Sequence, residues 1–242
     1  MNQWTPADTT GRGVLGEDVG AMAIQRSPTE MGQDQMMRPV TLTIANAGGT
    51  LEALSDQVAA SFEKALALGR ERLQLEGVDV LVVDAPDDAI PEWGVGGYTY
   101  GPHVVLVAVD PSASLVERHI VSTLVHEFHH AMRWRGPGCG GNLAQMLVSE
   151  GLAQLFEEET LGEAPPSSRT PITDAEIAEA RATLFEPKFS PSKWFFGAEG
   201  VTRLFGYAYG YRICKEYALA TGSDAAQLVD TPSRHIIEFS AS

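Results

Sequence analysis

Residues 126–130, HEFHH, place two histidines four positions apart with a glutamate directly after the first. On a helix, positions i and i+4 lie on one face, so the imidazoles of His126 and His130 can bind one divalent cation. Glu127 points to another side of the same helix, where its carboxylate can lie beside a metal-activated water without ligating the metal. These residue types at this spacing are typical of zinc hydrolases, in which the glutamate is the general base.

A catalytic zinc site needs a third protein ligand, and the candidate is Glu150, twenty positions after His130. Its neighbours on the expected helix face are apolar, namely Met146, Leu147 and Ala153. A carboxylate among them is costly to bury unless it is paired or coordinated; the alternative is that Glu150 is partly exposed. The glycine-rich segment 136–141 lets two helices lie antiparallel, which brings Glu150 to the histidines. This donor set predicts a catalytic site with one open position for one Zn2+ per chain, although other divalent metals accept the same donors.

The remaining histidines are not expected to bind the metal. His129 is one position off the ligand pair and faces another side of the helix, so it is expected to pack or to support the site. His119 shares the face of His126 but lies two turns away, about 10 Å, which is too far for the same metal. His103 and His235 carry no spacing signal and are interpreted as structural or surface residues.

The elements that must position these residues read as strands first and helices later, which predicts an α+β fold. Alternating or apolar β-branched runs predict three strands, at 40–45, 78–85 and 103–110. Apolar residues at three- and four-residue steps predict a helix from Thr50 to about Glu76. The glycine-rich segment 93–101 is interpreted as a hairpin or edge region.

Helices dominate the second half of the chain. The motif-bearing helix is expected over 115–134, with Ser114 and Glu117 as a capping box. The remaining predicted helices are one capped by Asn142 and running up to Gly162, a short one capped by Thr173 and Glu176, one over 202–222 and a terminal segment, RHIIEF. The two histidines and Glu150 therefore fall on two consecutive helices.

Length and composition indicate one sizeable folded domain. The chain has 242 residues, of which 44% are hydrophobic and 20% charged. Residues 1–38 lack a sustained period and are predicted to be a flexible tail, and the domain is expected over 39–242. The two cysteines, Cys139 and Cys214, are expected to be reduced thiols, with a single bridge as the alternative.

Charge and hydropathy exclude several classes of partner. A net charge of −15 disfavours binding to nucleic acids and to anionic lipid surfaces. The N-terminus lacks the basic start and apolar run of a secretory signal, and the apolar run Val104–Val109 is too short to span a bilayer. We therefore expect a cytoplasmic protein, whose oligomeric state the sequence does not indicate.

Four blocks in this order, HEFHHAMRW, LVSEGLAQLFEEE, WFFG and GYAYGYRICKEY, resemble a family of predicted zinc-dependent bacterial proteases. That family was first catalogued as a domain of unknown function, and the resemblance covers roughly residues 100–240. It implies a zincin-type fold with the glutamate-ligand arrangement of gluzincins: His126, His130 and Glu150 match the metal ligands and Glu127 the catalytic glutamate. Thermolysin-like enzymes carry an aspartate four residues after the ligand glutamate, which supports a histidine ligand. Here that position is Gln154, so support must be weaker or come from elsewhere.

A zinc peptidase also needs a donor for the oxyanion, and the segment GYAYGYR, 206–212, is the predicted source. Tyr207 and Tyr211 lie four positions apart on one helix face, and Arg212 follows. Tyr207 is our choice among them; the alternative is a packed aromatic stripe. Gly206 and Gly210 are expected to allow close helix packing.

The aromatic run Trp194-Phe195-Phe196 is expected to be core, with a pocket lining as the alternative. The strand at 103–110 is a candidate edge strand above the motif-bearing helix, where an extended peptide could pair with it; a core strand fits the same sequence.

These features together favour a zinc-dependent metallopeptidase acting on a peptide or protein substrate. One alternative is a zinc hydrolase of a small amide or ester. The other is a catalytically inactive metal-binding interaction protein, which the presence of Glu127 argues against.

Overall fold

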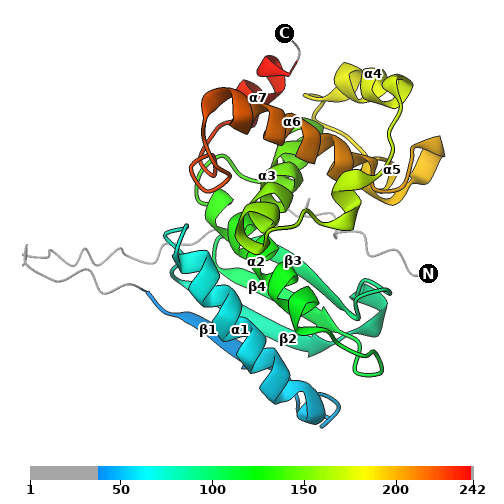
Figure 1. Cartoon of the computed structure of the whole chain (residues 1–242). Helices are drawn as coiled ribbons and strands as arrows, with labels where there is room; N and C mark the ends of the chain where they lie inside the picture. The colour runs from blue at the N-terminus through cyan, green and yellow to red at the C-terminus, as the bar shows by residue number, and fades with distance from the viewer. Residues whose placement is uncertain (1–37, 241–242) are drawn as a thin grey trace, which may run out of the picture. The chain divides into compact units, whose positions relative to one another are not determined.

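The computed structural model describes residues 38–240, and these form a small mixed sheet followed by a helical second half (Figure 1). The strands are β1 (Val40–Ile44), β2 (Val78–Asp84), β3 (Val95–Gly101) and β4 (Val104–Val109). The helices are α1 (Ser55–Arg70), α2 (Glu117–Arg133), α3 (Leu143–Leu161), α4 (Asp174–Thr183), α5 (Pro191–Phe196), α6 (Phe205–Thr221) and α7 (Ser233–Phe239). The predicted α+β class is confirmed, whereas residues 1–37 of the predicted tail lie outside the described residues.

The sheet has the strand order β1-β2-β4-β3, in which β3 is the antiparallel strand at one edge. The other neighbours, β1 with β2 and β2 with β4, are parallel. Of the two interpretations of 103–110, the core strand is confirmed and the edge strand is not, because β4 pairs on both sides and the edge belongs to β3. The segment 93–101, interpreted as a hairpin or edge region, contains that strand.

Helices α1 and α2 lie side by side over one face of the sheet (Figure 1). The alternate residues of β2 and β4 that face them are almost fully buried: Val78, Val80, Val82, Val105, Val107 and Val109. Leu124 and Phe128 of α2 belong to the same core. Because each fully buried valine, leucine or phenylalanine contributes about 1.5–3 kcal/mol, this layer fixes α2 against the sheet.

Helix α3 packs on α2 and is crossed closely by α6. A Cβ at Gly151 would lie 2.2 Å from the carbonyl oxygen of Gly210, and a Cβ at Gly210 would lie 2.1 Å from that of Leu147. Both helices therefore require glycine where they cross. The predicted close packing at Gly210 is confirmed, and it sets α6 against the turn of α3 that carries Glu150.

Several predicted helix bounds differ from the structure, including two starts: α1 begins at Ser55 rather than Thr50, and α6 begins at Phe205 rather than near residue 202. The first helix ends at Arg70 rather than near Glu76, because the chain turns back to bury Leu73 and Leu75 in the core. The predicted capping box of the second helix is wrong: α2 begins at Glu117 without a side-chain cap, and Glu117 pairs with Lys64 of α1 instead.

The predicted caps of the next helices are confirmed. The side chain of Asn142 accepts a hydrogen bond from Gln145 N–H at the start of α3. Thr173 and Glu176 form a complete capping box at the start of α4.

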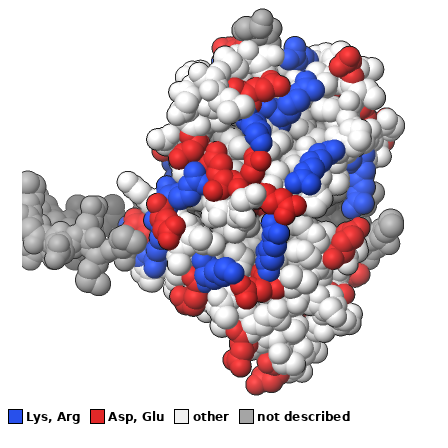
Figure 2. All heavy atoms as spheres, in the orientation of Figure 1, with Lys and Arg blue, Asp and Glu red and all other residues white. Residues whose placement is uncertain are grey.

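Acidic and basic side chains alternate on the face shown in Figure 2, and the basic ones do not gather into one patch there. Ion pairs with glutamates include Arg72 with Glu159 and Lys215 with Glu158. Among the described residues, no helix combines the length and apolar character needed to cross a membrane. Cys139 and Cys214 are both free, and no disulfide joins them.

Candidate metal centre

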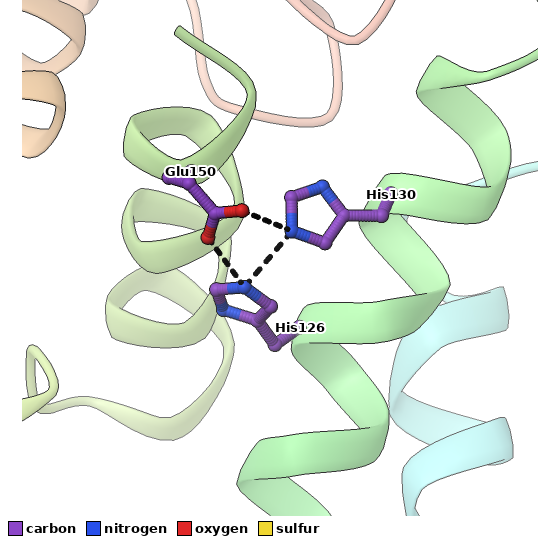
Figure 3. Close-up of side chains that lie close together, drawn as sticks. All are labelled: His126, His130 and Glu150. Carbon is purple, nitrogen blue, oxygen red and sulfur yellow. Dashed lines mark hydrogen bonds and ion pairs between the residues drawn. The ribbon is translucent and has the colours of Figure 1, made fainter. Parts of the chain in front are cut away.

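The three predicted ligands, His126 and His130 of α2 and Glu150 of α3, converge at one point (Figure 3). The two Nε2 atoms lie 3.0 Å apart. Glu150 Oε2 is 3.2 Å from Nε2 of His126, and Oε1 is 3.4 Å from Nε2 of His130. The side chains of His126, His130 and Glu150 are 15%, 8% and 14% exposed, so the cluster is mostly buried but still in contact with solvent.

The opposite ring nitrogens are already engaged, which leaves the two Nε2 atoms as the metal-binding atoms. Nδ1 of His126 lies 2.6 Å from Oε1 of Glu157, and Nδ1 of His130 lies 2.9 Å from Oγ of Ser149. Because a carboxylate only accepts, the Nδ1 of His126 carries a proton, which leaves Nε2 as the atom that binds a metal when the imidazole is neutral. Ser149 can accept from Nδ1–H of His130 in the same way.

Electrostatics also match a site built for a cation. Burial disfavours the charged form of His126, yet the hydrogen bonds to Glu150 and Glu157 outweigh it and raise the pKa of this imidazole to about 10. Burial likewise favours a neutral Glu150, but the charge of His130 and the hydrogen bonds from both histidines hold the pKa of the carboxyl well below its usual range. The cluster thus demands positive charge at its centre, and two imidazole nitrogens with one carboxylate oxygen fit zinc.

Glu157 supplies the support that Gln154 does not. Its Oε1 receives Nδ1–H of His126 and its Oε2 receives the hydroxyl of Ser122. Gln154 instead joins α6 to the loop after α3, since its Nε2 donates to the carbonyl of Tyr207 at 2.9 Å. The expectation that support comes from elsewhere is therefore confirmed. Glu157 lies seven residues after Glu150, so the shared helix face was a signal that could have identified it.

Glu127 is buried between α2 and the edge strand β3. Its Oε2 accepts a hydrogen bond of 2.6 Å from Oγ1 of Thr99. Although burial opposes a charged His130, the carboxylates of Glu150 and then Glu127 raise the pKa of that imidazole well above its usual value. Glu127 is thus near the ligand cluster without belonging to it, as a general base requires.

Of the three predicted oxyanion donors, Tyr207 is the one that lies near the cluster. Burial, and then the charges of Glu150 and Glu127, raise the pKa of the Tyr207 phenol well above its usual value, so it stays protonated and able to donate. Tyr211 instead donates to Glu158 at 2.6 Å, and Arg212 lies over the ring of Tyr209.

The aromatic residues match the sequence predictions only in part. Tyr98 of β3, which was not predicted, has a phenol whose pKa is raised by burial and then by the charges of Tyr100, Glu127 and Glu150. In the run 194–196, Trp194 and Phe195 are core as expected, and Phe195 packs edge-on against Tyr207. Phe196, in contrast, is 63% exposed.

The other histidines stay outside the cluster, as expected. His129 is fully buried, its Nε2 lies 3.2 Å from the carbonyl of Ala225, and burial holds its pKa well below the usual value. His119 stacks on Trp93 with 4.6 Å between ring centroids. His103 bonds the carbonyl of Gly77 through Nδ1.

Comparison with known families agrees with this geometry. A family model described as "Predicted Zn-dependent protease (DUF2268)" matches residues 58–238. The chain belongs to this family, since the match spans well over half of its length. No match was found among curated proteins or among solved structures.

Proposed function

We propose that this member of the predicted zinc-dependent protease family is a metallopeptidase that cleaves peptide bonds by water attack. The observation that carries the proposal is the convergence of His126, His130 and Glu150, with Glu127 held beside them on the same helix. Two histidines, one glutamate and space for a further ligand are the donor set of catalytic rather than structural zinc.

Each residue has a distinct role in the proposed reaction. When bound by His126, His130 and Glu150, zinc acts as a Lewis acid that polarises a carbonyl group and lowers the pKa of a coordinated water to about 7. Glu127 accepts a proton from the attacking water and passes it to the leaving amine. Tyr207, whose phenol stays protonated, donates a hydrogen bond to the oxyanion that develops on the scissile carbonyl.

The edge strand β3 supports a peptide as the substrate. The carbonyl of Gly94 accepts from Asp110 N–H, at the end of β4, whereas the carbonyl of Val95 turns the other way and accepts from Ile90 N–H. Because this direction alternates along an antiparallel strand, the N–H and C=O groups of Gly97 and Thr99 point away from β4. An extended peptide can pair with these groups, directly beside Glu127. This feature favours a peptide over a small amide or ester.

Metal analysis and two substitutions test the proposal. Purified protein should hold about one zinc per chain. Glu127→Gln should keep the zinc and abolish hydrolysis of a peptide library, because the amide cannot take the proton. Tyr207→Phe should lower kcat by about 10²–10³-fold, the usual cost of losing one oxyanion donor. Glu117→Gln, an exposed change at the start of α2, is the control and should behave as wild type.

The results separate the alternatives. Absence of zinc would overturn the proposal. Zinc without turnover would favour a metal-binding interaction protein, and hydrolysis of small amides but not of peptides would favour a small-molecule hydrolase.

A further inference from the structure

We infer that Thr99 of β3 is a positioning residue that orients the carboxylate of Glu127 through its hydroxyl group. The inference rests on the proposed function and adds to it a residue that belongs neither to the motif nor to the metal ligands. Thr99 also connects Glu127, the proposed general base, to the strand that would pair with the substrate.

The contact between Thr99 and Glu127 is buried and directional. Thr99 is 7% exposed. Its Oγ1 lies 2.6 Å from Oε2 of Glu127 and 3.1 Å from the carbonyl oxygen of the same residue. A hydroxyl has one hydrogen, and the shorter contact leads to a charged acceptor, so donation to the carboxylate is the stronger of the two. The bond fixes Oε2 and leaves Oε1 as the oxygen that can accept a proton.

Gly97 confines the same carboxylate from the neighbouring position of the strand. A Cβ at Gly97 would lie 2.6 Å from Cγ and 2.7 Å from Oε1 of Glu127. Positions 97 and 99 lie on one face of β3 because side chains alternate along a strand. The strand thus forms a slot for the Glu127 side chain. The backbone of Gly97, which carries no Cβ, borders the slot on one side, and the hydroxyl of Thr99 borders it on the other.

The backbone groups that would pair with an extended peptide belong to the same two residues, Gly97 and Thr99. Their N–H and C=O groups point along the sheet, away from β4, while their side-chain positions face Glu127. A substrate strand paired here therefore stiffens the residues that hold the base. Orientation of Glu127 affects proton transfer rather than substrate affinity, so its loss should appear in kcat.

A matched pair of substitutions tests the inference. Thr99→Val keeps the shape of the side chain and removes the hydroxyl, whereas Thr99→Ser keeps the hydroxyl and removes a methyl group. We expect Thr99→Val to lower kcat about ten- to hundredfold, the value of one hydrogen bond to a charged group, with KM within about twofold of wild type. Thr99→Ser should keep kcat within about threefold. Thr43→Val, an exposed change on β1, should have no effect.

Two further measurements make the test independent of turnover. Zinc content should be the same in Thr99→Val as in Thr99→Ser, and both variants should unfold in a single cooperative transition above the assay temperature. Crystal structures of the zinc-loaded variants should show the Glu127 carboxylate displaced in Thr99→Val and in its original place in Thr99→Ser. If wild-type protein cleaves no peptide, the proposed function fails, while these structures still decide whether Thr99 positions Glu127.

A second variant covers the case in which Thr99→Val does not fold. Gly97→Ala crowds the same carboxylate from the other side of the slot and should lower kcat with zinc retained. Unchanged kcat with Glu127 in place in Thr99→Val, an equal defect in Thr99→Ser, or wild-type turnover in Gly97→Ala would each overturn the inference.

Discussion

Replacing Glu157 tests whether zinc binding depends on a carboxylate that is not itself a ligand. Oε1 of Glu157 lies 2.6 Å from Nδ1 of His126, and the Glu157 side chain is 5% exposed. This bond holds the imidazole so that Nε2 faces His130 and Glu150. Glu157→Gln should therefore weaken zinc binding although all three ligands remain.

The size of the effect follows from the type of hydrogen bond that is lost. Bonds to a charged partner contribute about 1.5–3 kcal/mol, and neutral bonds about 0.5–1.5 kcal/mol. Glutamine keeps an acceptor oxygen and loses the charge, so we expect a loss of about 1.4 kcal/mol, or about tenfold in zinc affinity. Glu157→Ala also removes the acceptor, and its loss should approach 100-fold, the upper end for groups that support a histidine ligand.

Competition titration against a chromophoric chelator measures the zinc affinity, and circular dichroism verifies that the variants are folded. The matched control is Glu158→Gln, the next residue of α3, whose carboxylate pairs with Lys215 and Tyr211 outside the ligand cluster. Wild-type zinc affinity in Glu157→Gln would refute the role of Glu157. An equal loss in Glu158→Gln would show that any charge change on this helix has the same effect.

Two further predictions concern the framework around the site. Gly151→Ala would place a methyl group 2.2 Å from the carbonyl oxygen of Gly210, so we expect about 1–3 kcal/mol of destabilisation in chemical denaturation. Gly140→Ala has open space around it and should leave the unfolding free energy unchanged; equal stability of the two variants would contradict the close crossing of α3 and α6. Although burial opposes it, hydrogen bonds from Thr202 and from the start of α4 lower the pKa of Glu176 from 4.5 to about 2. The stabilisation from Glu176 should thus be present above pH 4.5 and disappear as pH falls towards 2. Glu176→Gln should flatten this part of the stability–pH curve. An unchanged curve in this variant would show that the Glu176 carboxylate does not stabilise the fold.

The ligand set could be predicted from the sequence because local periodicity determines most of it. His126 and His130 share a face on any helix, and Glu150 stands out as a carboxylate on an apolar helix face. The caps at Asn142 and Thr173 were equally local and were confirmed. These features depend on contacts within a few residues, which a single sequence displays directly.

The edge strand β3 was difficult to predict because close contacts with neighbouring segments, and not the strand conformation, require its glycines. Glycine is unfavourable in strands, so the segment 93–101 was interpreted only as a hairpin or edge region and not as a strand with defined bounds. The structure explains two of these glycines by close approach: a Cβ at Gly96 would lie 2.5 Å from the carbonyl oxygen of Asp88, and one at Gly97 would meet Glu127. The absence of a side chain at Gly97 therefore lets β3 lie against Glu127, and its absence at Gly96 lets Asp88 lie against the strand.

The supporting residues Glu157 and Thr99 act on different parts of the site, and this difference separates two kinds of defect. Glu157 contacts a candidate metal ligand within the helical layer, whereas the hydroxyl of Thr99 bonds Glu127 from the sheet and bonds none of the candidate ligands. A change at Glu157 should thus alter zinc affinity first, and a change at Thr99 should alter turnover with zinc retained. Thr99 reaches Glu127 only because β3 packs against α2, so sequence spacing does not reveal it, whereas Glu157 shares a helix face with Glu150. The contrast between the two variants therefore tests the placement of strand and helix together.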